Sequence, residues 1–237
     1  MVLDQAVLRF LSEFHGRWHF FDSVFLFSHN ADLIKGAVMC FYWWVFFSAE
    51  DSQQRLDEKR SKLVTGLVAS LFAVLIARLM ADLLPFRDRP LFSPDFQLSW
   101  ARLEDKNYQA WSAFPSDHAA MFMGIAVSIL SVSRKIGWLV VAYVAIFVCF
   151  CRVYLGIHWF TDVVVGSLLG AACVLAAHTR VIQDRVWFLA MKWWNASPGS
   201  MAAFATFLTA SIWTIFGDVL GIAHAVWAVI THAHGAT

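Results

Sequence analysis

The chain has 237 residues, of which 59% are hydrophobic and only 15% are charged, and its formal net charge is +1. Together with 22 phenylalanines and 12 tryptophans, this composition argues against a soluble protein and is typical of a membrane protein with several spans. The near-neutral charge gives no reason to expect a nucleic-acid partner. The chain does not open on a basic segment followed by an apolar run, so no cleaved signal peptide is expected.

Residues 1–30 place apolar side chains at helical spacing with charged residues between them. The apolar positions include Val7, Phe10 and Phe14, and the charged ones include Asp4. This pattern fits an amphipathic helix that lies on the membrane surface better than it fits a span.

The rest of the chain alternates apolar stretches with polar connections. A span needs about 20 largely apolar residues. By that measure the candidate spans, in chain order, are 31–49, 63–84, 114–133, 136–155, 159–178 and 201–230. The connections are a polar stretch at 50–62, an irregular loop at 85–113, and a mixed segment at 179–199 that we expect at the interface.

These elements predict an all-α, polytopic membrane helix bundle of five to six transmembrane helices plus the N-terminal interfacial helix. We expect one membrane-embedded domain over 1–237. It would consist of the interfacial helix 1–30, a core at 31–178, and a C-terminal extension at 179–237 with an extra span.

Three charged segments stand at predicted membrane boundaries: RDRP at 87–90, FPSDHA at 114–119 and CRVYLGIHWFTD at 151–162. Charged side chains cost about 2.5–3.5 kcal/mol each at mid-membrane, so those near a bilayer are candidates for function. Counting the crossings places all three segments on the same side of the membrane. A modest excess of Lys and Arg in the opposite loops favours a cytoplasmic location for those loops and an outward-facing site.

The residue types in these segments suit a phosphate. Arg89 and Arg152 can each hold phosphate oxygens through a forked guanidinium group. Ser116, Asp117 and His118 would begin a helix whose open N–H groups and dipole favour an anion, with the Ser116 hydroxyl as a further donor. This combination predicts a site that stabilises a phosphoryl transition state.

The histidines supply the chemistry. His158 and Asp162 are four residues apart and share one helix face. A carboxylate on one ring nitrogen of His158 fixes the tautomer and leaves the other nitrogen as a nucleophile. His118, at a different helix start, can then protonate the leaving oxygen. Water would hydrolyse the resulting phosphohistidine, and the scheme requires neither a metal nor another cofactor.

These residues resemble the three-part signature of the type 2 phosphatidic acid phosphatase superfamily, which is written K-x6-RP, PSGH and SR-x5-H-x3-D. The matching positions here are Arg89–Pro90, then Pro115, Ser116, Asp117 and His118, then Arg152, His158 and Asp162. FPSDHA and the run GIHWFTDVVVGSLLGA also resemble the undecaprenyl-diphosphatase branch. The resemblance covers roughly 1–178.

The resemblance implies an integral-membrane lipid phosphatase that converts undecaprenyl diphosphate to undecaprenyl phosphate for cell-wall synthesis. Its setting would be the bacterial inner membrane, with the site facing the periplasm or exterior. A phosphatase for another lipid, such as phosphatidylglycerol phosphate, phosphatidate or lipid A, and a lipid phosphotransferase are alternatives. A non-catalytic lipid-binding membrane protein is a more remote one. The expected partners are the lipid substrate and the bilayer.

Besides the aspartate in the glycine position of the second motif, two departures from the signature matter for phosphate binding. Asp82 stands where the first motif has lysine, and Cys151 stands where the third has serine. A carboxylate cannot replace a phosphate-binding cation. Arg78, one turn before Asp82, and Arg87 are the candidates for supplying the missing charge. These departures favour the non-catalytic alternative.

Overall fold

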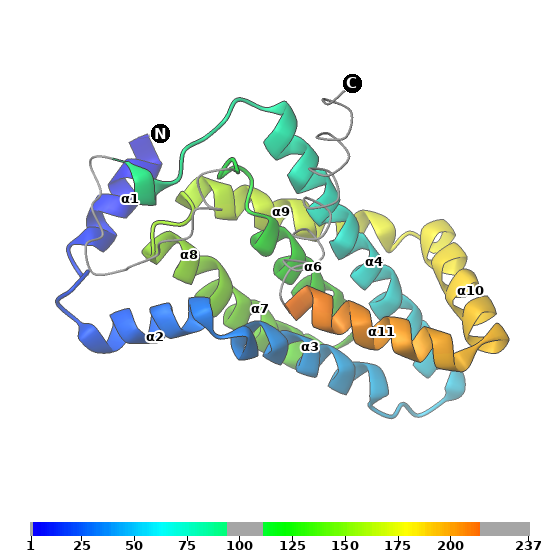
Figure 1. Cartoon of the computed structure of the whole chain (residues 1–237). Coiled ribbons are helices and arrows are strands. Elements are labelled where there is room, and N and C mark those ends of the chain that lie inside the picture. Colours follow the sequence, from blue (N-terminus) through cyan, green and yellow to red (C-terminus); the bar gives the residue numbers. More distant parts are fainter. Residues whose placement is uncertain (1, 94–110, 214–237) are drawn as a thin grey trace, which may run out of the picture. The chain divides into compact units, whose positions relative to one another are not determined.

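The computed structural model describes residues 2–93 and 111–213, and within these ranges the secondary structure is helical, without strands (Figure 1). The all-α prediction is confirmed for this part of the chain. The chain divides into two compact units, Met1–Leu189 and Ala190–Thr237, and the predicted phosphate-site residues all belong to the first. The last part of the predicted span at 201–230, from residue 214 onward, lies outside the described residues.

The helices of the first unit begin at the N-terminus and continue into α10. In chain order they are α1 (Val2–Ser12), α2 (His19–Asn30), α3 (Asp32–Phe47), α4 (Gln53–Leu83), the short 3-10 helix η1 (Pro90–Phe92), α6 (Asp117–Val132), α7 (Arg134–Tyr143), the π-helix η2 (Val144–Phe150), α8 (Cys151–Tyr154) and α9 (Phe160–Ala177). Helix α10 (Arg180–Ala196) crosses into the second unit, which also holds α11 (Pro198–Trp213).

Three helical runs are long and apolar enough to cross a membrane: Gln53–Leu83, Arg134–Tyr154 and Phe160–Ala177. Helices α2 and α3 count as a fourth candidate when taken together, as a pair bent by 66°. Asp117–Val132 and Pro198–Ile212 are shorter apolar helices. By length and composition the described residues therefore contain three to four spans, and the number five to six stays a prediction.

The polar stretch 50–62 is largely helical, which corrects its prediction as a connection. Helix α4 begins at Gln53, and the Ser52 hydroxyl accepts a hydrogen bond from the Arg55 N–H at 3.4 Å. One turn further on, Lys62 pairs with Glu58 at 2.8 Å. A capping serine and an i,i+4 ion pair stabilise a polar helix end, so α4 extends beyond its apolar part.

The N-terminal region contains two helices where the sequence predicted one. Helix α1 ends at Ser12 and α2 begins at His19, with Gly16 between them at a φ of 74°. That φ lies in the left-handed region, which glycine adopts without steric cost. The turn separates α1 from the bent α2–α3 pair.

The core forms where α6 packs against α4 and α9. Gly166 and Gly170 let the backbone of α9 approach that of α6. An added Cβ at Gly166 would overlap the carbonyl oxygen of Ser116, and one at Gly170 would overlap the carbonyl oxygen of Ala120. Such small-residue contacts are a common way for membrane helices to approach closely. The beginning of α9 is thereby fixed beside the beginning of α6, and these two helix starts carry the predicted catalytic residues.

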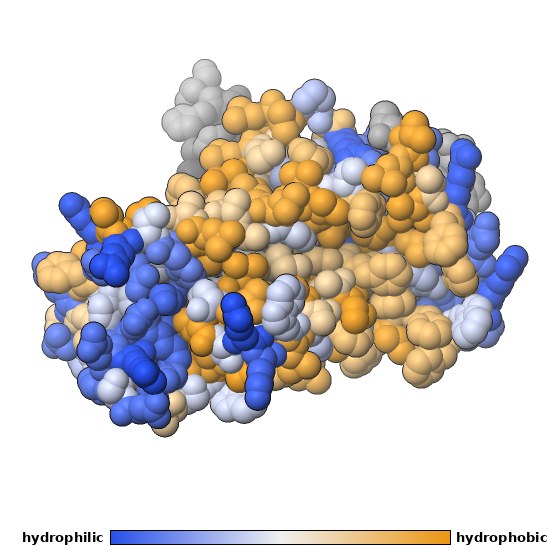
Figure 2. Space-filling view, turned by 180° about the vertical axis from the view of Figure 1, so that it is seen from behind, coloured by the Kyte–Doolittle hydropathy of each residue, from blue (hydrophilic) through white to orange (hydrophobic). Residues whose placement is uncertain are grey.

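Large apolar side chains cover much of the outside of the first unit. Examples are Phe72 and Leu79 on α4 and Leu168 and Leu175 on α9, each at least half exposed. In Figure 2 apolar side chains form a broad field, with hydrophilic side chains gathered at its edges. This distribution suits helices that face lipid.

Candidate active site

A tight turn brings His158 back beside Arg152. The carbonyl of Arg152 accepts hydrogen bonds from the N–H groups of Ile157 at 2.9 Å and His158 at 3.2 Å. Gly156 takes a φ of 67°, which places it in the left-handed region that favours glycine. Its carbonyl accepts the Leu91 N–H at 2.8 Å, so the turn is also tied to the segment that follows Arg89.

The ring of His158 has one nitrogen held by the backbone. Its Nδ1 lies 2.8 Å from the carbonyl oxygen of Ala113. A carbonyl can only accept, so Nδ1 carries the proton and Nε2 keeps its lone pair. The guanidinium of Arg89 lies 3.3 Å from this Nε2 through its Nη1, which also donates to the Ile157 carbonyl at 3.0 Å. A cation therefore lies beside the nitrogen that the sequence predicts as the nucleophile.

Asp162 lies farther from His158 than the sequence predicted. Its Oδ2 is 3.8 Å from the His158 Nδ1, which is an ion-pair distance and too long for a hydrogen bond. That same oxygen accepts the Trp159 N–H at 2.8 Å. In this structure the tautomer of His158 is set by Ala113, and Asp162 adds an electrostatic contact.

Burial lowers the pKa of His158 below its ordinary value of 6.5. The contact with Asp162 raises this pKa in part, and the charges of Arg89 and Arg152 lower it further. The net direction is downward, so the neutral imidazole is the favoured form near neutral pH.

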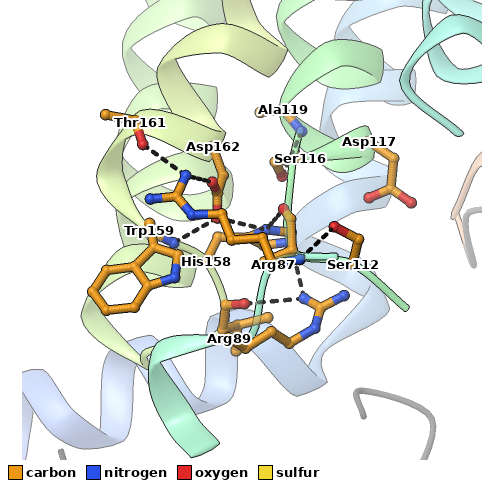
Figure 3. A network of polar contacts seen from close by, with 12 residues as sticks. Arg87, Arg89, Ser112, Ser116, Asp117, Ala119, His158, Trp159, Thr161 and Asp162 are labelled. Carbon is orange, nitrogen blue, oxygen red and sulfur yellow. Dashed lines mark hydrogen bonds and ion pairs between the residues drawn. The ribbon is translucent and has the colours of Figure 1, made fainter. Parts of the chain in front are cut away.

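Asp162 joins three segments of the site. Its side chain is fully buried and forms an ion pair with Arg87, and its backbone carbonyl accepts the Ser116 N–H at 3.0 Å. Figure 3 shows Arg87, His158, Trp159 and Asp162 close together, with Asp117 to one side of them. The two helix starts and the segment 87–89 are therefore connected through one residue, Asp162.

The guanidinium of Arg87 contacts carboxylates at both ends. Its Nη1 pairs with Asp162 and donates to the Thr161 hydroxyl at 2.9 Å, and its Nη2 lies 2.7 Å from the Asp4 carboxylate. These contacts do not support the prediction that Arg87 supplies the phosphate-binding charge missing at Asp82. They favour a role in holding Asp162.

Asp117 is the carboxylate partner of His118. Its Oδ1 lies 2.8 Å from the His118 Nδ1 and accepts the His118 backbone N–H at 2.7 Å. Its other oxygen pairs with Arg78, whose guanidinium also lies over the Trp111 ring at 5.3 Å. Both Asp117 and Arg78, predicted as phosphate-binding residues, therefore reach the site in this structure through His118.

The first amides of α6 are less open than the sequence predicted. The N–H of Ser116 donates to Asp162, the N–H of His118 donates to Asp117, and the N–H of Ala119 lies 3.5 Å from the Ser116 hydroxyl. Serine and aspartate at a helix start commonly cap its amides in this way. Ser116, fully buried, is in this structure the N-cap of α6.

Arg152 is buried, with 5% of its surface exposed, and its Nε has no hydrogen-bond partner within the described residues. It interacts electrostatically with both His118 and His158. A buried donor without a partner is costly, and an anion would satisfy it. The structure thus places near both imidazoles a guanidinium whose Nε can still donate a hydrogen bond.

Sequence reasoning missed two contributors, Asp4 and Ala113. The sequence pattern places Asp4 only among the charged residues of an amphipathic surface helix, yet Asp4 is 2% exposed and shares a helix face with the buried Leu8 and Leu11. An acidic residue at i, i+4, i+7 spacing with buried leucines was the available signal. Ala113 acts through its backbone carbonyl, which no side-chain pattern reveals.

Comparisons with known proteins point to one family. The model of the PAP2 superfamily matches residues 61–187. An undecaprenyl-diphosphatase of Sulfolobus acidocaldarius is 41% identical over 59 residues, which cover 25% of this chain and 29% of that protein. The lipid A 1-diphosphate synthase of Escherichia coli is 27% identical over 139 residues, covering 57% and 55%. The undecaprenyl-diphosphatase BcrC of Bacillus subtilis is 26% identical over 153 residues, covering 65% and 70%.

The chain spans 29% and 55% of the length of the first two of these relatives. No solved structure matches it. The family model, however, covers more than half of the chain and includes all three motif segments. The chain belongs to the PAP2 superfamily.

Proposed function

We propose that this protein is an integral-membrane lipid phosphatase that removes the terminal phosphate of undecaprenyl diphosphate through a phosphohistidine on His158. The observation that carries this proposal is the position of Arg89, 3.3 Å from the lone-pair nitrogen of His158. A guanidinium at a nucleophilic nitrogen can bind the oxygens of a phosphoryl group and leave its phosphorus in reach of that nitrogen.

In the first step the His158 Nε2 attacks the terminal phosphorus, and an N–P bond forms as the bond to the bridging oxygen breaks. The leaving group is the lipid monophosphate, and His118 donates a proton to its oxygen. Asp117 supports that role, because a carboxylate 2.8 Å from Nδ1 orients the ring and stabilises its charged form.

In the second step water attacks the phosphorus and the N–P bond breaks. His118, now neutral, accepts the proton of the attacking water. His158 recovers its lone pair and inorganic phosphate leaves. The Ala113 carbonyl holds the Nδ1 proton throughout, so the same nitrogen is available in every cycle.

Arg89 and Arg152 would stabilise the negative charge that develops on the phosphoryl oxygens in the transition state. Arg152 supports this role because its buried Nε lacks a protein partner within the described residues. Electrostatic stabilisation by such preorganised groups usually contributes more to catalysis than any other single effect. Ser116 would cap α6, while Arg78 would position Asp117 and Arg87 would position Asp162.

The relatives and the surface support the proposed substrate and location. Two of the relatives described above are named undecaprenyl-diphosphatase. The apolar outer face of α4 and α9 would allow a long lipid tail to stay in the bilayer while its diphosphate enters the site. We place the protein in the bacterial inner membrane, with the site facing the periplasm or exterior, as the modest charge bias of the loops suggests.

The relative named lipid A 1-diphosphate synthase favours a second candidate, transfer of the phosphoryl group to a lipid acceptor. The first step would be the same. An acceptor phosphate would replace water in the second, provided that water is excluded. The two candidates differ in whether inorganic phosphate appears when undecaprenyl diphosphate is the sole lipid.

The test is phosphate release by purified protein in detergent from undecaprenyl diphosphate, phosphatidylglycerol phosphate, phosphatidate and lipid A. We expect the fastest release from undecaprenyl diphosphate and none from the His158→Ala variant. Faster phosphate release from a glycerophospholipid would overturn the proposal that undecaprenyl diphosphate is the substrate. Unchanged release in His158→Ala would overturn the role of His158 as nucleophile. No release from any single lipid by the folded wild type would overturn hydrolysis and favour transfer to a lipid acceptor or the non-catalytic alternative.

A further inference from the structure

We propose that Asp4, on the N-terminal helix α1, is a positioning residue of the active site that holds Arg87 and Asp162 in place and thereby aims His158. This inference rests on the proposed function. It gives α1, which the sequence predicted as a membrane-surface helix, a direct connection to the catalytic segment.

Asp4 takes part in a closed ring of contacts. Its Oδ1 accepts the Thr161 N–H at 2.9 Å, and its Oδ2 accepts the Thr161 hydroxyl at 2.9 Å. The same Oδ2 lies 2.7 Å from the Arg87 Nη2. Arg87 in turn pairs with Asp162, the residue that follows Thr161. The side chain of Asp4 thus fixes both the first turn of α9 and the arginine that contacts it.

Burial gives this ring its importance. Asp4 and Asp162 are almost completely buried, and a buried charge is costly unless it is paired and hydrogen-bonded. Burial raises the pKa of Asp4, but hydrogen bonds from Thr161 and Arg87 reverse the shift, and the net direction is downward. Asp4 therefore remains a carboxylate, and Arg87 has two anions that set its orientation.

Two routes lead from Arg87 to His158. One runs through Asp162, whose Oδ2 accepts the Trp159 N–H and lies 3.8 Å from the His158 ring. The other runs along the backbone, where the Arg87 carbonyl accepts the Ala113 N–H at 2.9 Å and the Ala113 carbonyl holds the His158 Nδ1 at 2.8 Å. A displaced Arg87 would disturb both supports of the nucleophile.

Asp4 itself has no place at the phosphate in this arrangement. Its two oxygens face Thr161 and Arg87, while Arg89 and Arg152 are the proposed phosphate ligands. Loss of its charge should therefore change the rate of the chemical step and leave substrate binding nearly unchanged. A purely structural tie would lower stability without this separation of kcat from KM.

The test compares steady-state hydrolysis of undecaprenyl diphosphate by wild type, Asp4→Asn, Arg87→Gln and the double variant. We expect Asp4→Asn to lower kcat by about 10- to 100-fold, as misplacement by about an ångström does, with KM within about twofold of wild type. Because Asp4 acts through Arg87, the double variant should lose little more than Arg87→Gln alone.

Leu8→Ala is the matched control, since Leu8 is 3% exposed on the same face of α1 but makes no polar contact with its side chain. We expect it to lower the thermal midpoint while kcat stays near wild type. An equal loss of kcat in Leu8→Ala, a normal kcat in Asp4→Asn, or additive losses in the double variant would each overturn the role of Asp4.

Thr161→Val covers the case in which Asp4→Asn does not fold, because it removes only the hydroxyl between Asp4 and Arg87. It should show a smaller loss of kcat at unchanged KM, and a normal kcat would count against the inference. Absence of hydrolysis by wild type would overturn the proposed function itself, and the role of Asp4 in it. An active wild type with an unaffected Asp4→Asn would overturn this inference alone.

Discussion

The protonation of individual histidines determines what the residues of this site can do. Ala113 assigns the proton of His158 to Nδ1, and Asp117 lies at Nδ1 of His118. One imidazole thus has a neutral acceptor beside it, which suits a nucleophile. The other has a carboxylate, which suits a group that must carry a proton.

The lowered pKa of His158 predicts the acid limb of the pH–rate profile. His158 is the proposed nucleophile and would attack as the neutral ring, and its depressed pKa keeps the ring neutral below pH 6.5. We expect kcat/KM to hold as the pH falls through 6.5 and to decline only at the lower folded-state pKa. The profile of kcat/KM on undecaprenyl diphosphate measures this, and an acid limb at or above 6.5 would contradict it.

Asp117→Asn should reduce hydrolysis to an extent that depends on the leaving group. Undecaprenyl diphosphate releases a phosphate monoester, a weak base, whereas phosphatidate releases an alkoxide that needs a proton. We expect kcat/KM to fall at most tenfold on the diphosphate. On phosphatidate it should fall about 10²-fold or more, which is the contribution that general-acid catalysis typically makes. Relative kcat/KM on the two lipids is the measurement. The matched control is Asp82→Asn, at an exposed position near the end of α4. Similar losses of kcat/KM on both lipids in Asp117→Asn would argue against His118 as the general acid.

At the scale of elements, close contact between α6 and α9 brings the motifs together. Gly166 and Gly170 allow the α9 backbone to approach that of α6, so Ser116 can donate to the Asp162 carbonyl at 3.0 Å. The predicted bounds of these two helices are nearly correct because their apolar runs are long. The predicted start of α4 is wrong because the ion pairs and the cap at Ser52 outweigh the polarity of the stretch.

Gly170→Val should separate the two helix starts. The new Cβ would overlap the carbonyl oxygen of Ala120, which is backbone and cannot move aside alone. Overpacking of this kind costs about 1–3 kcal/mol, and we expect a lower thermal midpoint in detergent together with reduced activity. Gly199→Val is the control, because nothing lies within 4 Å of its added Cβ. Equal midpoints for the two variants would show that the close approach is not needed.

At the scale of the whole molecule, the proposed outward orientation places the two ends of α4 on opposite sides of the membrane. In a cysteine-free background, Asp88→Cys follows the α4 C-terminus and Glu58→Cys lies in its first two turns, both at exposed positions. A membrane-impermeant maleimide added to intact cells should label Asp88→Cys. It should reach Glu58→Cys only after permeabilisation, and the reverse pattern would place the site in the cytoplasm.

The sequence by itself determined the helical class, the membrane character and the three segments that carry the candidate site. Run length and motif spacing are local properties, so they can be read along the chain. Only the tertiary structure decided the partners: Ala113 for His158, Asp117 and Arg78 for each other, and Asp4 for Arg87 and Thr161. The Asp4–Thr161 contact joins residues 157 positions apart. Such a pairing depends on how the helices pack, and packing is not encoded in any short stretch of residues.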